Sequence, residues 1–109
     1  MKIYCFALDL INDSKLISEY KKYHEKIWPE ITNSIKAAGI ENLDIYLIGN
    51  RLFMIMKVNE TFTFEKKTIM DLENPKVQEW ENLMWNYQQK LPFAKEGEKW
   101  VLMDKIYQL

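Results

Sequence analysis

Hydrophobic residues at the start of the chain occupy both alternating positions of an extended strand. Bulky side chains fill one set of positions and apolar side chains also fill the other: Tyr4, Phe6, Leu8 and Leu10 against Ile3, Cys5 and Ala7. A strand with one face in water would instead alternate apolar and polar residues. The pattern predicts a first strand over residues 2–10 that is covered on both faces.

A helical period follows this strand and is interrupted once. Residues 12–14 are typical N-cap residues, and apolar side chains then recur every three or four positions up to residue 27. Pro29 suits the first position of a new helix, where no backbone N–H is needed. We expect a first helix that ends before Trp28-Pro29 and a second that ends at Gly39 as its C-cap.

Two apolar runs in the middle of the chain are separated by turn-forming residues. Residues 43–48 and 52–58 consist largely of strand-forming side chains, and Gly49-Asn50-Arg51 connects them. A short connection of this composition favours a β-hairpin. We therefore expect two neighbouring antiparallel strands.

The last third of the chain shows one clear helical period and one further strand. Residues 61–72 have a mixed pattern that we assign to no element. Asn74 and Pro75 are a typical N-cap and first helical residue, and the apolar period after them predicts a helix that ends before Pro92. Alternation over residues 100–107 predicts the last strand.

The predicted order is strand, helix, strand, strand, helix, strand. This order is typical of the ferredoxin-like βαββαβ fold of the α+β class, an antiparallel sheet with both helices on one face. The strands are apolar on both faces, and an uncovered sheet face would forfeit about 25 cal/mol per Å² of hydrophobic stabilisation. We expect a second copy to cover it, in a homodimer of the dimeric α+β barrel type.

Composition narrows the class of protein further. The 109 residues are 48% hydrophobic and suffice for one domain over residues 1–109. Fifteen basic and sixteen acidic residues give a net charge of -1, which disfavours nucleic-acid binding. Cys5 is the only cysteine, so no intrachain disulfide and no cysteine-based metal cluster is expected. No segment resembles a signal peptide or a membrane span, and we expect a cytoplasmic protein.

A single histidine is the main candidate for chemistry. His24 follows Tyr20 by four residues, so the imidazole and the phenol share one face of the predicted helix. A partly shielded histidine can give or take a proton near pH 7. The commoner interpretation of a lone histidine is a packed or surface side chain without a catalytic role, and both interpretations stay open at this point.

The second main helix carries a further group of candidates. Trp80 lies at a helical period and is by default a core residue. Glu81 and Trp85 could supply a carboxylate for sugar hydroxyls and an aromatic platform, or they could form a solvated helix face. No phosphate-binding loop, nucleophile elbow or pair of catalytic carboxylates is present.

The segment from Tyr20 to Glu30, with His24 and Ile27-Trp28-Pro29-Glu30 inside it, resembles the signature of the L-rhamnose mutarotase family. The similarity covers nearly the whole chain and continues at Gly39, Ile45-Tyr46-Leu47, Arg51 to Val58 and Val77 to Trp80. Members of that family are dimeric α+β barrels without a cofactor. The resemblance therefore implies an isomerase that binds a monosaccharide and needs neither metal nor cofactor.

The resemblance also implies roles for individual residues. His24 matches the proton donor, Tyr20 and Trp80 match substrate-binding residues, and Tyr46 lies in a matching segment and is a further substrate-binding candidate. Two substrate-binding positions depart from the family pattern. Glu81 replaces the second residue of a tryptophan pair, and Leu43 replaces a tyrosine.

These departures bear on the sugar, because changed hydroxyl stereochemistry requires changed hydrogen-bond partners. L-fucose is a candidate beside L-rhamnose, and both are 6-deoxy-L-hexoses. In the implied mechanism His24 delivers a proton to the ring oxygen and recovers it on ring closure. Tyr20 orients the sugar or relays a proton.

Two other functions are compatible with this fold. Haem-degrading and cofactor-free monooxygenases of the dimeric α+β barrel class can also use one histidine and a tryptophan. A non-catalytic module would bind a small ligand without changing it. Neither alternative accounts for the combination of Tyr20, His24 and Ile27-Trp28-Pro29-Glu30.

Overall fold

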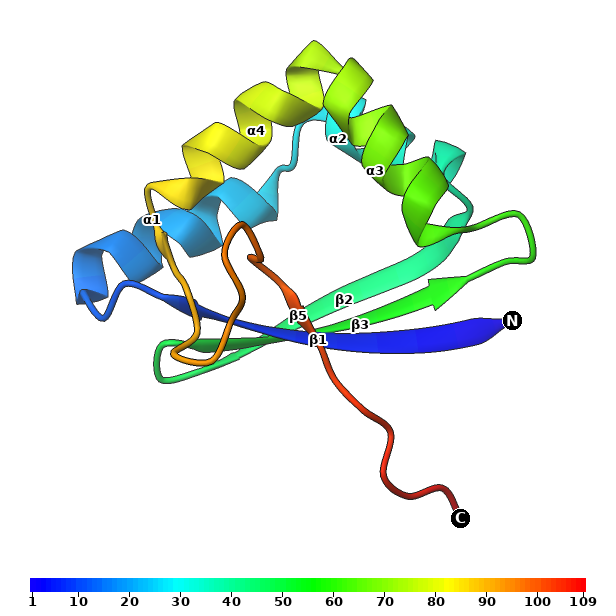
Figure 1. The fold of residues 1–109 in the computed structure, drawn as a ribbon. Helices are drawn as coiled ribbons and strands as arrows, with labels where there is room; N and C mark the ends of the chain where they lie inside the picture. The colour runs from blue at the N-terminus through cyan, green and yellow to red at the C-terminus, as the bar shows by residue number, and fades with distance from the viewer.

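Four helices cover one face of an antiparallel sheet and leave the other face open in the computed structural model, which describes residues 1–109 (Figure 1). The elements in chain order are β1 (Lys2–Leu10), α1 (Ser14–Glu25), α2 (Pro29–Ala37), β2 (Ile40–Ile48), β3 (Arg51–Val58), α3 (Phe64–Glu73), α4 (Pro75–Trp85), β4 (Gln88–Gln89) and β5 (Val101–Leu102). The sheet order is β2-β3-β1-β4, and β5 also pairs with β1. This arrangement confirms the predicted α+β, ferredoxin-like fold.

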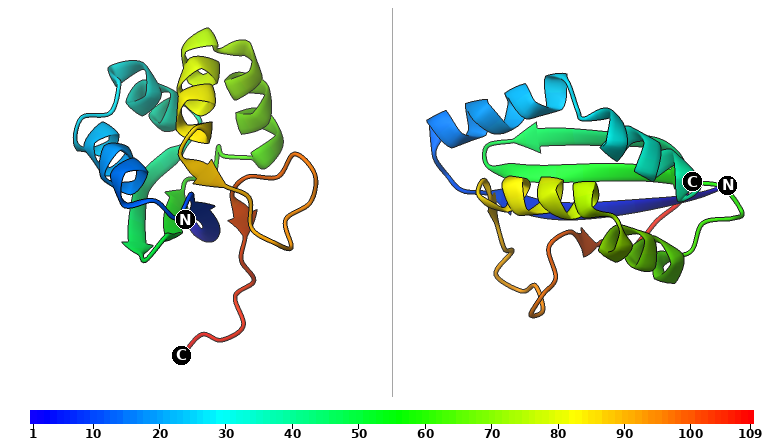
Figure 2. Two further views of the ribbon diagram at one scale, coloured as in Figure 1. Left: turned by 90° about the vertical axis from the view of Figure 1, so that its left-hand side faces the viewer. Right: turned by 90° about the horizontal axis from the view of Figure 1, so that it is seen from above.

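The boundaries of the first two helices follow the predicted capping residues. The side chain of Asp13 accepts hydrogen bonds from the backbone N–H groups of Lys15 and Leu16, at 2.9 and 3.0 Å, and so caps α1. Pro29 is the first residue of α2, as expected from its missing N–H. The short break before Pro29 lets the two helices take different directions across the sheet (Figure 2).

Gly39 ends α2 in a backbone conformation that disfavours a side chain. Its φ is +95°, and an added Cβ would lie 2.7 Å from both Asn59 Oδ1 and Thr61 Oγ1. We expect Gly39→Ala to lower the free energy of unfolding by about 2–3 kcal/mol, because strain and close contacts add. Gly49→Ala is the matched control, since Gly49 has φ +58° and open space around it. That control should lose about 1 kcal/mol. Equal losses in urea unfolding would contradict the role of the contacts.

Residues 61–72, which we assigned to no element, largely form α3. The hydroxyl oxygen of Thr63 accepts a hydrogen bond from the backbone N–H of Lys66 at 3.0 Å and caps the helix. None of the residues of α3 is fully buried. A helix with so little buried surface has a weak apolar period, and for this reason the sequence pattern did not predict it.

The helix after Asn74 and the last strand are both shorter than predicted. Helix α4 ends at Trp85 and not before Pro92, because Gln88 and Gln89 pair with Leu10 and Asp9 of β1. Strand β5 contains only Val101–Leu102, and the prediction of a strand over residues 100–107 was wrong in length. Beyond it the chain runs away from the body on the open side of the sheet (Figure 1).

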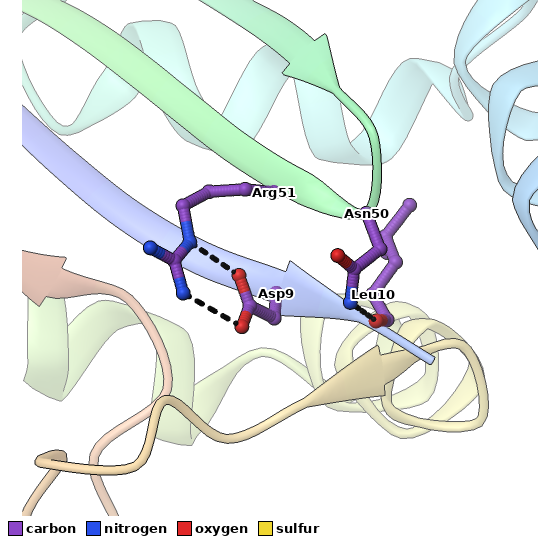
Figure 3. Close-up of polar contacts among 4 residues, drawn as sticks. All are labelled: Asp9, Leu10, Asn50 and Arg51. Atoms are coloured by element: carbon purple, nitrogen blue, oxygen red, sulfur yellow. Dashed lines mark hydrogen bonds and ion pairs between the residues drawn. The ribbon is translucent and has the colours of Figure 1, made fainter. Parts of the chain in front are cut away.

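Polar contacts fix the β2–β3 hairpin to the end of β1 (Figure 3). Asn50 donates from Nδ2 to the backbone oxygen of Leu10 at 2.9 Å. Arg51 donates from Nε and Nη2 to the two carboxylate oxygens of Asp9, at 2.8 and 3.1 Å. Two parallel charge-assisted hydrogen bonds satisfy the buried carboxylate and hold the register of β1 against β3.

Apolar side chains lie on both faces of the sheet, as predicted, although the open face also carries charged residues such as Asp44 and Lys57. Leu8, Leu10 and Leu52 point toward the helices and are essentially inaccessible to water. On the open face Tyr46 and Ile48 remain 59% and 82% exposed. None of the helices has the length and apolar character that crossing a membrane requires.

Candidate active site

A cavity of about 460 Å³ lies between the helices and the sheet. The helices form two rows above the sheet, α1 with α2 and α4 with α3 (Figure 2). Helix α1 contributes Tyr20 and His24, helix α4 contributes Trp80 and Glu81, and β2 contributes Leu43. The structure thus brings five of the six predicted site residues to one cavity, whose volume is typical of small-molecule sites.

The sixth residue, Tyr46, does not line this cavity. It pairs with Phe53 across the two strands, and both side chains lie on the open face of the sheet. The neighbouring Ile45 faces the helices and does line the cavity. Because successive strand residues point to opposite faces, a matching segment does not place all its residues in one site. Tyr46 is therefore left out of the site described below.

The imidazole of His24 is oriented by the backbone of its own helix. Its Nδ1 lies 2.8 Å from the carbonyl oxygen of Tyr20. A carbonyl oxygen only accepts hydrogen bonds, so Nδ1 carries the hydrogen, and in the neutral ring Nε2 keeps its lone pair. Burial lowers the pKa of His24 below 6.5, and the hydrogen bond to Tyr20 offsets only part of that shift. At pH 7 His24 is therefore a neutral proton acceptor.

The phenol of Tyr20 lies against this imidazole. The two ring centroids are 4.4 Å apart, and Gln88 donates from Nε2 to the Tyr20 hydroxyl oxygen at 3.3 Å. Burial raises the pKa of Tyr20 above 10.0, while the hydrogen bond from Gln88 acts in the opposite direction. The phenol thus keeps its proton at pH 7 and can donate it in a hydrogen bond to a ligand.

Trp80 also contacts the imidazole. Its ring meets His24 edge-on at 5.7 Å between centroids, and Trp28 meets Trp80 at 5.0 Å. Trp28 belongs to the Ile27-Trp28-Pro29-Glu30 sequence, so that sequence supports the site through Trp80. Trp85, which we considered as an aromatic platform, does not line the cavity and carries Lys99 over its ring at 4.9 Å.

Glu81 shares its part of the cavity with three charged residues that the sequence did not single out. Burial raises the pKa of Glu81 above 4.5; Lys99 lowers it, Asp71 raises it and Lys67 lowers it, in decreasing order of effect. Lys67 and Asp71 come from α3, the helix that the pattern did not predict, and lie one turn apart. Their spacing of four residues was the only available signal.

Comparison with known proteins identifies the family. A family model described as L-rhamnose mutarotase matches residues 3–109. The chain belongs to this family. A Xanthomonas campestris pv. campestris protein named L-fucose mutarotase is 40% identical over 111 residues, which cover 100% of this chain and 89% of that protein. An L-rhamnose mutarotase from Listeria monocytogenes is 36% identical over 50 residues, 44% of this chain and 48% of that protein.

A solved structure shows the same fold. The crystal structure of an L-rhamnose mutarotase from Formosa agariphila has a TM-score of 0.74 and 20% identity, and the match covers 100% of this chain and 99% of that one. Membership of the L-rhamnose mutarotase family confirms the predicted enzyme class, an isomerase of the mutarotase type. The comparisons give no support to the monooxygenase or the non-catalytic module. The roles of individual residues stay predictions.

Proposed function

We propose that this member of the L-rhamnose mutarotase family interconverts the α and β anomers of L-fucose, with L-rhamnose as a second substrate. The observation that carries the proposal is the hydrogen bond that His24 Nδ1 donates to the Tyr20 carbonyl oxygen. This hydrogen bond leaves Nε2 of a cavity-lining residue as a proton acceptor. Full-length similarity to a protein named L-fucose mutarotase supports L-fucose as the preferred sugar.

One histidine suffices to move the proton that mutarotation requires. Nε2 of His24 takes the proton of the anomeric hydroxyl and delivers it to the ring oxygen as the bond between C1 and that oxygen breaks. The open-chain aldehyde then rotates about the C1–C2 bond. On closure Nε2 takes the proton back from the C5 hydroxyl and returns it to the oxygen on C1. The imidazole ends each cycle neutral, and both transfers follow general acid–base catalysis.

The other cavity residues position the sugar in this proposal. The Tyr20 phenol donates a hydrogen bond to a sugar oxygen, and the face or edge of Trp80 packs against the ring. The sheet side of the cavity is apolar, with Leu43, Met54 and Met56 among its lining residues. A 6-deoxy sugar presents a methyl group at C6, and this apolar wall suits a methyl group better than a hydroxymethyl group.

The pH dependence of exchange tests the state of His24. Only the neutral ring can accept the first proton, so activity is lost as pH falls. Because burial lowers the pKa of His24, kcat/KM should reach half its plateau below pH 6.5. The raised pKa of Tyr20 should keep the plateau flat above neutral pH. Glu81→Gln is the control, since Glu81 also lines the cavity and its raised carboxyl pKa could itself produce a loss of activity at low pH. A midpoint above 6.5 in this variant would contradict the assignment.

NMR saturation transfer between the two anomers tests the proposed function directly. The unmodified protein should accelerate anomer exchange of L-fucose more than that of L-rhamnose, after subtraction of the spontaneous rate. Equal rates for the two sugars would overturn the preference for L-fucose. No acceleration with either sugar would overturn the mutarotase assignment for this chain.

The proposed assembly is a homodimer in which two open sheet faces pack together. The exposed Tyr46 and Ile48 on that face support it, as do Ile106 and Tyr107, which are 94% and 75% exposed in the last segment. Sedimentation equilibrium should give the mass of two chains, and the mass of one chain would overturn the dimer.

We also propose a cytoplasmic location, on the grounds of the lone and unpaired Cys5. Fractionation of the source cells would test it.

A further inference from the structure

Charged side chains gather at the part of the cavity formed by α3 and α4. Lys67 and Asp71 come from α3, Glu81 from α4, and Lys99 from the segment before β5, and all four line the cavity. Helix α3 lies in the other row of helices from α1, which carries His24, and at the opposite end of the molecule (Figures 1 and 2). The cavity therefore has a proton-transfer side and a separate charged side.

The charges on this side balance. Two ammonium groups and two carboxylates give no net charge, so this wall offers no electrostatic preference for an acidic or a phosphorylated sugar. A neutral hydroxyl group, in contrast, can donate to a carboxylate oxygen and accept from an ammonium group at the same time. Paired opposite charges in a cavity wall are thus well suited to neutral sugars.

The Lys67–Asp71 pair is poorly explained by helix stability alone. Lys67 Nζ lies 2.5 Å from Asp71 Oδ2, and the side chains are only 29% and 20% exposed. The lysine precedes the carboxylate, which is the weaker order for a pair four residues apart on a helix. Partial burial adds a desolvation cost to both groups. These features favour a role in binding over a role in folding.

Resting on the proposed function, we propose that the Lys67–Asp71 pair is a specificity-determining element that binds the C4 hydroxyl of the sugar. In a pyranose ring C4 lies across from C1, so a sugar whose anomeric carbon meets His24 directs its C4 hydroxyl away from α1. L-Fucose and L-rhamnose differ at C2 and C4. The pair therefore distinguishes the axial C4 hydroxyl of L-fucose from an equatorial one, and Glu81 adds a second carboxylate beside it.

The test compares L-fucose with its C4 epimer, 6-deoxy-L-glucose, which isolates this one hydroxyl. Anomer exchange of both sugars is measured for the unmodified protein, Asp71→Asn and Lys67→Met. The unmodified protein should favour L-fucose. In each variant KM for L-fucose should rise about tenfold with a smaller change in kcat, and the preference over the epimer should fall by a similar factor.

The matched control comes from another ion pair, which lies on α4. Lys76 Nζ and Glu79 Oε2 lie 3.2 Å apart, their side chains are 55% and 57% exposed, and neither lines the cavity. Glu79→Gln should leave both sugars within twofold of the unmodified protein. Lys76 is left unchanged, because its Nζ lies 5.7 Å from the centre of the Trp28 ring, which contacts Trp80. Lys67→Arg, which keeps the charge, should retain most of the preference for L-fucose. It therefore distinguishes loss of the charged group from loss of folding.

The outcomes separate the two proposals. If the unmodified protein accelerates exchange but the variants keep its preference for L-fucose, the proposed role of Lys67 and Asp71 is overturned and the proposed function stands. The same holds if the unmodified protein does not distinguish the C4 epimers. No acceleration of either sugar by the unmodified protein would overturn the proposed function, and this inference with it.

Discussion

His24→Ala should remove nearly all enzymatic anomer exchange while the chain still folds. Positioned acid–base groups contribute about 10²–10⁴-fold to a rate, and no other histidine is present to replace this one. Alanine is the best helix former, so α1 should persist. The carbonyl of Tyr20 that loses its partner lies near the end of the helix, beside a cavity that water can enter. Saturation transfer with L-fucose measures the loss.

Lys22→Ala is the matched control for this experiment. Lys22 lies on the same helix, is exposed, and does not line the cavity. It should keep the full rate. Circular dichroism spectra of both variants should match that of the unmodified protein. Exchange in His24→Ala at more than about a tenth of the original rate would sink the assignment of His24 as the proton carrier.

Trp80→Ala should cause the largest loss of stability of any substitution near the cavity. The side chain is 8% exposed and meets the rings of His24, Tyr23 and Trp28. Removal of a large buried aromatic side chain costs about 3–5 kcal/mol, because both transfer free energy and packing are lost. Urea unfolding at one fixed protein concentration measures this, since association would otherwise shift the midpoint.

Trp85→Ala provides the comparison, because Trp85 lies on the same helix but is 40% exposed. It should lose about 1 kcal/mol or less. Compared with Trp80→Ala, Trp80→Phe should be more stable and should exchange the anomers faster, since a smaller ring still packs against the imidazole. If Trp80→Ala and Trp85→Ala lose the same free energy of unfolding, Trp80 is not the packing centre that its contacts indicate.

Local signals in the sequence account for the elements that were predicted correctly. Asp13 caps α1 with its own side chain, Pro29 opens α2, and Gly49-Asn50-Arg51 closes the hairpin. Each of these effects involves residues close together in the chain, and pattern analysis can detect them. The apolar alternation of β1 on both faces was equally visible.

The end of α4 and the whole of α3 were not predicted. Helix α4 stops at Trp85 because Gln88 and Gln89 pair with β1, some eighty residues earlier in the chain. Helix α3 buries too little surface to show a clear period. Tertiary pairing sets the end of α4, and a local pattern does not record it, whereas α3 has too small an apolar face to produce a period.

The same distinction applies to the cavity. Tyr20 and His24 are one helical turn apart, so their association could be predicted from spacing. Lys67 and Asp71 show the same spacing, but nothing in the sequence indicates that α3 faces the cavity. Tyr46 was placed by similarity of a segment, and the strand pleat puts it on the opposite face.

The central position of β1 has a consequence for synthesis of the chain. This strand precedes all of its partners in the chain: Leu8 pairs with Leu52, and its other neighbours follow at Gln88–Gln89 and Val101–Leu102. A ribosome must therefore expose an apolar strand with two open edges until more than forty further residues have emerged. Such a strand invites pairing with other nascent chains, and folding must wait for contacts of long sequence separation. Chaperone demand in this protein should concentrate on β1.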